Sequence, residues 1–150
     1  MQIVGIGNIL RGDDGIGPTL IEKFQQDKET SNEHEYIDIA GDAFALLDIL
    51  AAEGPKLIID CCEMNEKPGT VKIFDIDGST LEQHDSMLSL HSMGFSDVYK
   101  LALLLNPNPN CRLIAVQPES LEFNGKLSKV LKEKIPYIEK LIKEEIKNYA

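Results

Sequence analysis

The segment that most constrains the fold runs from Ile3 to Gly17, where an apolar stretch is followed by closely spaced glycines and two adjacent aspartates. Ile3–Ile6 has the pattern of a short buried strand, and the glycines after it permit a tight turn that a Cβ atom would obstruct. Asp13 and Asp14 then stand where a helix is expected to begin, and one carboxylate there can cap that helix by accepting backbone N–H bonds. The pair is therefore either a redundant cap or a cap with a second carboxylate that is available for chemistry.

Strand and helix patterns alternate along the rest of the chain, which predicts a parallel sheet with helices on both faces. Further strands are predicted at Tyr36–Ile39, Lys56–Asp60, Val71–Ile76 and Cys111–Val116. Helices are predicted from Ile16 to Gln26, from Gly41-Asp42 to Gly54, after His91 as far as Asn106, and from Lys126 toward Tyr149. The connection before Val71 is too short for a crossover helix, so that strand is predicted to be antiparallel and at an edge.

Apolar residues at helical spacing indicate which face of each helix is buried. Pro136 lies inside the last helical pattern and is expected to kink or split that helix. The predicted buried positions are Ile16, Leu20, Ile21 and Phe24; Phe44, Leu46, Leu47 and Leu50; Val98, Leu101, Ala102 and Leu105; and Leu127, Leu131, Ile135, Ile138, Ile142 and Ile146.

Composition limits the classes of function. The 150 residues fit a single domain over 1–150, and a net charge of −10 argues against nucleic acid or an anionic membrane as a partner. No apolar run is long enough to span a bilayer, and the start of the chain does not have the pattern of a signal peptide. The three cysteines include no CxxC pair, which indicates a reduced, cytoplasmic protein.

A dinucleotide site is disfavoured. Gly5-x-Gly7 matches the first part of the GxGxxG fingerprint, but the third glycine would fall at Leu10. Asp13 and Asp14 would also place negative charge at the helix N-terminus where a pyrophosphate binds, and would repel it.

Two acids and one histidine are the stronger candidates. Asp60 closes an unbroken apolar strand, and if that strand neighbours the first one, Asp14 and Asp60 lie at adjacent strand ends, where open α/β sheets bind ligands. Two carboxylates with the imidazole of His91 would suit a divalent metal such as nickel or zinc. The alternatives are that Asp60 caps a nearby helix or loop and that His91 is an ordinary surface or packing residue. His34 and His84 lie in more charged segments and are weaker candidates.

Cys61 and Cys62 follow Asp60 directly. They could be soft metal ligands or nucleophiles, but cysteine is also a common small buried residue at strand ends.

Four blocks in order resemble the maturation endopeptidases of nickel–iron hydrogenases. The blocks are Gly5-Ile-Gly7-Asn8-Ile-Leu10-Arg-Gly-Asp13-Asp14-Gly15-Ile-Gly17; Leu57-Ile-Ile-Asp60 with Pro68-Gly-Thr70; Leu90-His91-x-x-Gly94 with Asp97-Val98; and Val116-Gln-Pro118-Glu119-Ser120-Leu121. The similarity extends over essentially the whole chain.

The resemblance implies a three-layer α/β/α fold with a twisted, mostly parallel five-stranded sheet. It also implies an endopeptidase that removes the C-terminal extension of a hydrogenase large-subunit precursor after nickel insertion. The metal-contacting residues of the family fall on Asp14, Asp60 and His91, and either aspartate could act as the general base. The nickel is expected to arrive with the precursor rather than to be bound permanently. A monomer is expected, although the oligomeric state stays open.

The sequence departs from the family pattern at two places, of which the first bears on the substrate. The loop after the second strand reads Asp38-Ile-Ala-Gly41-Asp42 in place of a glycine-rich segment, which leaves the recognised precursor undetermined. Gln117 replaces the commoner apolar residue before Pro118. Two rival functions remain: a metallohydrolase with its own zinc or manganese, and a non-enzymatic, metal-dependent docking module for hydrogenase assembly.

Overall fold

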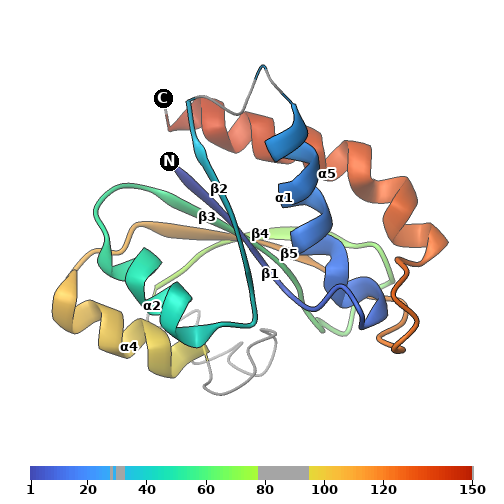
Figure 1. Ribbon diagram of the computed structural model, residues 1–150, viewed down its shortest axis with the longest axis horizontal. Coiled ribbons are helices and arrows are strands. Elements are labelled where there is room, and N and C mark those ends of the chain that lie inside the picture. The colour runs from blue at the N-terminus through green and yellow to red at the C-terminus, as the bar shows by residue number, and fades with distance from the viewer. Residues whose placement is uncertain (28, 30–32, 78–94, 150) are drawn as a thin grey trace.

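The computed structural model describes residues 1–27, 29, 33–77 and 95–149, and within them a five-stranded sheet lies between two layers of helices (Figure 1). The strand order is β2-β1-β3-β5-β4, and every neighbouring pair is parallel except β4 and β5. The predicted strands and the antiparallel edge strand are confirmed. The strands are β1 (Gln2–Ile6), β2 (Glu35–Ala40), β3 (Lys56–Cys61), β4 (Val71–Asp75) and β5 (Cys111–Val116).

The helices divide between the two faces of the sheet. Helices α1 and α5 cover one face and α2 and α4 cover the other, so the predicted three-layer α/β/α class is confirmed (Figure 1). No helix in the described part of the chain combines the length and apolar character needed to cross a membrane. The helical segments are η1 (Gly12–Gly15), α1 (Ile16–Gln26), α2 (Ala43–Ala51), α4 (Phe95–Leu105) and α5 (Lys129–Asn148).

Side-chain alternation along the central strand builds a core on each face. Leu57 and Ile59 of β3 belong to the core beneath α1 and α5, whereas Ile58 belongs to the core beneath α2 and α4. Every residue of β3 is buried, as expected for a central parallel strand covered on both sides. Burial of each large aliphatic side chain contributes roughly 1.5–3 kcal/mol to the fold.

The predicted buried faces of α2 and α4 are partly wrong. Phe44, Leu101 and Leu105 are exposed. Helix α4 packs against α2, and the residues it buries are spaced by three and four from Phe95 to Ala102, which turns Leu101 to the opposite side. Both helices are apolar on more than one face, so the apolar pattern alone does not identify the buried one.

Helix α5 is continuous across Pro136, so the proline does not split it. Pro136 is exposed, and the apolar residues spaced along the other side of α5 pack against the sheet. The helix begins at Lys129 rather than Lys126, because the Ser128 side chain caps it by accepting a hydrogen bond from the Leu131 N–H at 3.3 Å.

Candidate functional site

The candidate site lies at the carboxyl edge of β1 and β3, which are adjacent and parallel. The chain leaves β1 toward β2 on one side and returns to β3 on the other, so the strand order reverses between these two strands. Crevices at such a reversal are where open α/β sheets bind ligands. Segment η1 follows β1 and carries Asp14, and Asp60 lies near the end of β3.

Two glycines bring the start of α1 close to this edge. Gly7 has a φ of +136°, and a Cβ atom there would overlap the carbonyl oxygen of Asp14. A Cβ atom on Gly17 would lie 2.6 Å from the carbonyl oxygens of both Ile6 and Ile59. The first turn of α1 therefore lies directly over the boundary between β1 and β3, and Asp14 comes just before that turn.

Asp13 is a structural carboxylate. It is fully buried; its Oδ2 accepts hydrogen bonds from the N–H groups of Glu119 at 2.8 Å and Ser120 at 3.0 Å, and its Oδ1 accepts one from the Ser128 N–H at 2.6 Å. These bonds attach η1 to the loop after β5 and to the start of α5. The expectation that one aspartate caps the helix that follows it is wrong, because the N-cap residue of α1 is Gly15 and no side chain caps this helix.

Asp14 is buried in a different way. Its Oδ2 accepts a hydrogen bond from the Asn8 N–H at 2.8 Å, which fixes the carboxylate, but its Oδ1 has no hydrogen-bond partner among the described residues. A buried carboxylate oxygen without a donor is costly to the fold, and such groups call for an explanation beyond stability. An oriented carboxylate with one available oxygen can accept a proton or ligate a cation.

Asp60 is fully buried and follows Ile58 and Ile59 in β3. By alternation with Ile58, it lies on the face of the sheet that α2 and α4 cover. Burial raises the pKa of the Cys61 thiol, and the charges of Asp60 and Asp14 raise it further. The same three causes raise the pKa of Cys62. Both aspartates thus act on the same pair of thiols, as expected if the two strand ends bring them to one place.

The two thiols are poor candidates for chemistry as they stand. Cys61 and Cys62 are buried, and their raised pKa values keep them protonated near neutral pH. The thiolate is the form that attacks substrates and binds metals. Their environment therefore favours the interpretation as buried packing residues over nucleophiles or ligands.

The structure places two of the three predicted ligands. His91 lies outside the described residues, as does His84, so the third position stays a prediction. Among the residues that are described, no group of three or more histidine, cysteine, aspartate or glutamate side chains could hold a metal ion. His34 immediately precedes β2, at the opposite edge of the sheet from Asp14.

The loop after β2 reaches the same edge. Asp42 caps α2 by accepting hydrogen bonds from the N–H groups of Phe44 at 3.0 Å and Ala45 at 3.1 Å. The Asp38 side chain accepts one from the Ala40 N–H at 2.8 Å, and the Ala40 carbonyl accepts one from the Gly7 N–H at 2.7 Å. Asp38 near the end of β2 and Asp42 in the loop after it therefore shape the backbone beside the turn that follows β1.

The Gln117 side chain holds the loop after β3 at this edge of the sheet, a role that the sequence pattern did not explain. It is buried; its Oε1 accepts hydrogen bonds from the N–H groups of Met64 at 2.7 Å and Glu66 at 3.4 Å, and its Nε2 donates one to the Glu63 carboxylate at 2.9 Å. An apolar residue at this position could make none of these bonds. A buried amide fits here because the loop after β3 passes directly over the end of β5.

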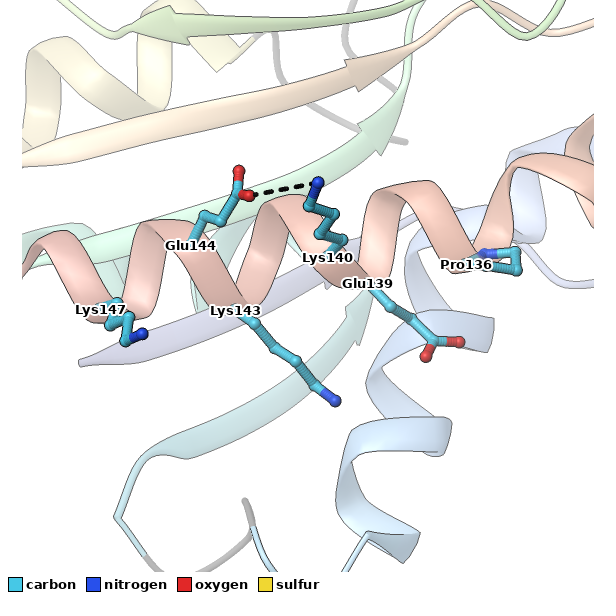
Figure 2. Close-up of a pocket in the computed structure, with 6 residues that line it drawn as sticks. All are labelled: Pro136, Glu139, Lys140, Lys143, Glu144 and Lys147. Atoms are coloured by element: carbon cyan, nitrogen blue, oxygen red, sulfur yellow. Dashed lines mark ion pairs between the residues drawn. The ribbon is translucent and has the colours of Figure 1, made fainter.

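A pocket along α5 lies away from these residues (Figure 2). Its side chains are mostly of alternating charge, and Lys140 and Glu144 form an ion pair at 3.8 Å. Such a pattern is typical of a solvated helix face. The lining residues are Pro136, Glu139, Lys140, Lys143, Glu144 and Lys147.

Comparison with protein families gives a match that covers most of the chain. The family model described as hydrogenase maturation protease matches residues 18–145. This range includes Asp60 and His91, and it begins after the motif that carries Asp14.

Several curated relatives are hydrogenase expression/formation proteins. HupD of Thiocapsa roseopersicina is 32% identical over 140 residues, which cover 91% of this chain and 63% of the relative. HoxM of Cupriavidus necator is 33% identical over 131 residues, which cover 86% of this chain and 65% of the relative. The chain therefore spans somewhat less than two thirds of the length of these relatives.

Solved structures share the fold. An endopeptidase from Escherichia coli has a TM-score of 0.78 at 26% identity, covering 95% of this chain and 90% of that one. The E. coli hydrogenase maturating endopeptidase HybD has a TM-score of 0.75 at 24% identity, covering 98% of this chain and 91% of that one.

Proposed function

Because the chain belongs to the hydrogenase maturation protease family, we propose that it is an endopeptidase that removes a C-terminal extension from the large-subunit precursor of a nickel–iron hydrogenase. We further propose that cleavage follows nickel insertion and that the protein recognises the metal in the precursor. Asp14, Asp60 and His91 are the residues to which we assign this recognition.

The observation that carries the proposal is the contrast between the neighbouring carboxylates of η1. Asp13 has both oxygens saturated by backbone donors, whereas Asp14 has one oxygen oriented by Asn8 and the other without a donor in the described structure. Asp14, whose carboxylate has one oxygen without a hydrogen-bond donor in the described structure, is also the residue that the family motif assigns to the metal. It lies at the same edge of the sheet as the second assigned acid, Asp60.

The proposed chemistry is hydrolysis of a peptide bond by a water molecule. One of the two aspartates takes a proton from the water as it attacks the scissile carbonyl, and the proton then passes to the departing amine. Nickel carried by the precursor would be part of the substrate, and it would polarise the carbonyl or the water. Three ligands from this chain leave positions open on the metal, so the precursor can keep ligands of its own.

Such an arrangement would couple cleavage to metal loading. A precursor without nickel would present no cation to the two buried acids, and it would lose the contact that docks its cleavage site. Since only loaded precursor would bind productively, the extension would stay in place until the metal centre is complete.

Replacement of Asp14 or Asp60 by asparagine, or of His91 by alanine, tests the assignment. Asparagine preserves the shape of the side chain, and in Asp14→Asn its amide oxygen can still accept the hydrogen bond from the Asn8 N–H. Asparagine has no negative charge with which to bind a cation, and it cannot act as a base. We expect each variant to stop cleavage of nickel-loaded precursor while the circular dichroism spectrum is unchanged. Asp48→Asn on the exposed side of α2 is the matched control and should cleave normally. Normal cleavage by Asp60→Asn or His91→Ala would contradict the assignment of these residues to metal recognition.

Two measurements distinguish the rival functions. A metallohydrolase with resident zinc or manganese would retain that metal through purification, whereas the proposed protease would carry little metal without precursor. A docking module would bind the precursor without reducing its mass.

A further inference from the structure

The segment between β1 and α1 is held by the loop that follows β5. The Leu10 carbonyl accepts a hydrogen bond from the Gly125 N–H at 3.1 Å, and the Asp13 N–H donates one to the Ser120 carbonyl at 2.9 Å. Gly12 has a φ of +55°, and a Cβ atom there would lie 2.6 Å from the Ser120 oxygen, so glycine permits this close approach. The two segments lie side by side near the start of α1 (Figure 1).

The Asp13 side chain adds three hydrogen bonds to this contact. Its oxygens accept from the N–H groups of Glu119, Ser120 and Ser128 at 2.6–3.0 Å. Glu119 and Ser120 lie shortly after β5, whereas Ser128 directly precedes α5. Asp13 is fully buried, so its loss would leave these donors without a partner. Asp13 therefore joins the segment after β1 to both ends of the loop between β5 and α5.

The same segment orients Asp14. Asp14 Oδ2 accepts a hydrogen bond from the Asn8 N–H at 2.8 Å, and its other oxygen has no donor in the described part of the chain. The turn formed by residues 8–14 is closed by the Arg11 N–H, which donates to the Asn8 carbonyl at 3.0 Å, and by the Asp14 N–H, which donates to the Arg11 carbonyl at 3.1 Å. Leu10 and Asp13, which the loop after β5 holds, lie within this turn. The orientation of the Asp14 carboxylate thus depends on a turn that the loop helps to fix.

A second set of contacts holds the beginning of the turn. The Gly7 N–H donates a hydrogen bond to the Ala40 carbonyl at 2.7 Å, and Gly7 lies against the backbone of Asp14. These contacts fix the backbone where the chain leaves β1, but they include no bond to the Asp14 side chain. Gly7 and Asn8 are consecutive, so their N–H groups report separately on the two sets of contacts.

We propose that Asp13 is a positioning residue for Asp14. Asp13 holds the turn of residues 8–14 against the loop after β5, and only while the turn is held does the Asn8 N–H keep the Asp14 carboxylate in its observed orientation. The inference rests on the proposed function, because it takes Asp14 to act on the precursor. Small displacements of a reacting group slow catalysis strongly, so loss of the Asp13 contacts should impair cleavage in a protein that is still folded.

The test uses two variants that weaken these contacts by different routes. Asp13→Asn keeps the size of the side chain, but its amide nitrogen cannot accept a hydrogen bond from a backbone N–H. Ser128→Pro leaves Asp13 intact and removes one of its donors, and the φ of −62° at Ser128 is one that proline adopts. Ser128→Ala is the matched control, because it loses the same side-chain cap of α5 and keeps the N–H group.

Amide hydrogen exchange in the free protein measures the positioning without any substrate. We expect the Asn8 amide to exchange at least about tenfold faster in Asp13→Asn and in Ser128→Pro, relative to the Gly7 amide of the same variant, and this ratio to stay within about twofold in Ser128→Ala. The Gly7 amide is the internal reference, because a general loss of stability speeds both amides alike. For nickel-loaded precursor, kcat/KM should fall at least about tenfold in the first two variants and stay within about twofold in Ser128→Ala.

An unchanged Asn8 exchange rate in both variants would overturn the proposal. Equal acceleration at Asn8 and Gly7 would also overturn it, because Asp13 would then only support the fold. Faster Asn8 exchange with normal cleavage would contradict it as well, since the orientation of Asp14 would not govern the reaction. If the unaltered protein leaves nickel-loaded precursor intact, the proposed function fails, and the exchange rates alone decide whether Asp13 positions Asp14.

Discussion

At the scale of single residues, Asp13 and Asp14 are neighbours in the chain with opposite roles in stability. The Asp13 carboxylate satisfies three backbone N–H groups in a buried setting. Asp14 accepts one hydrogen bond, and its other oxygen is buried without a donor in the described structure. We expect Asp13→Ala to lower the free energy of unfolding by about 3–5 kcal/mol, since it leaves three donors unpaired.

Asp14→Ala is the matched comparison, and it should change the free energy of unfolding by no more than about 1 kcal/mol, because it also removes a costly unpaired oxygen. Urea unfolding at pH 7 measures both variants. Equal losses of stability would mean that the two aspartates do not divide structure and function between them.

Gln117 gives a second prediction at this scale. Hydrogen bonds from the Gln117 side chain and from the Asn65 N–H lower the pKa of Glu63. Gln117→Leu removes the first of these, so the pKa of Glu63 should rise toward its ordinary value, and the pH at which this carboxylate becomes protonated should rise with it. Carboxyl titration by NMR measures the change, and the remaining glutamates serve as internal controls. An unmoved Glu63 pKa would contradict the assigned contact.

At the scale of elements, the sequence patterns predicted the strands well and the helix faces less well. Strand β3 contains the apolar run Leu57–Ile59, which is typical of a central strand covered on both faces. The connection before β4 is too short for a crossover helix, which predicts the antiparallel edge strand that is observed. Phe44 and Leu105 were assigned to the core because they are apolar, but burial depends on which face the neighbouring helix covers, and that is a tertiary contact.

The same limit applies to the site. Asp14 and Asp60 follow from strand ends and chain reversal, which a sequence pattern can indicate. The three donors to Asp13 come from residues more than a hundred positions away, so no local sequence pattern indicates these hydrogen bonds. Gln117 is similar, because its partners lie on the loop after β3, more than fifty positions earlier in the chain.

Pro136 lies inside α5 and affects the stability of the whole helix. Proline inside a helix removes one backbone hydrogen bond and crowds the preceding turn. Since Pro136 is exposed, Pro136→Ala loses no packing, and we expect it to raise the free energy of unfolding by about 1–2 kcal/mol, part of the gain being offset by the freer unfolded chain. Lys140→Ala, in the same helix, is the control and should change stability by less than about 0.5 kcal/mol. A destabilised Pro136→Ala would mean that the proline relieves a strain elsewhere in α5.

At the scale of the whole molecule, the parts of the candidate site gather at one edge of the sheet. Segment η1, the loop after β3 and the loop after β5 all reach the carboxyl ends of the strands and are bonded to one another there. The rest of the chain supplies two cores that hold this edge in place. We expect function to depend on the two buried aspartates at this edge, Asp14 and Asp60.

The proposed nickel-dependent cleavage can be measured by intact mass spectrometry of a hydrogenase large-subunit precursor incubated with this protein, with and without nickel in the precursor. We expect one discrete C-terminal peptide to be lost from the nickel-loaded precursor and the nickel-free precursor to keep its full mass. Equal cleavage of both forms would contradict recognition through the metal. Full mass in both forms, with binding intact, would contradict the protease function itself.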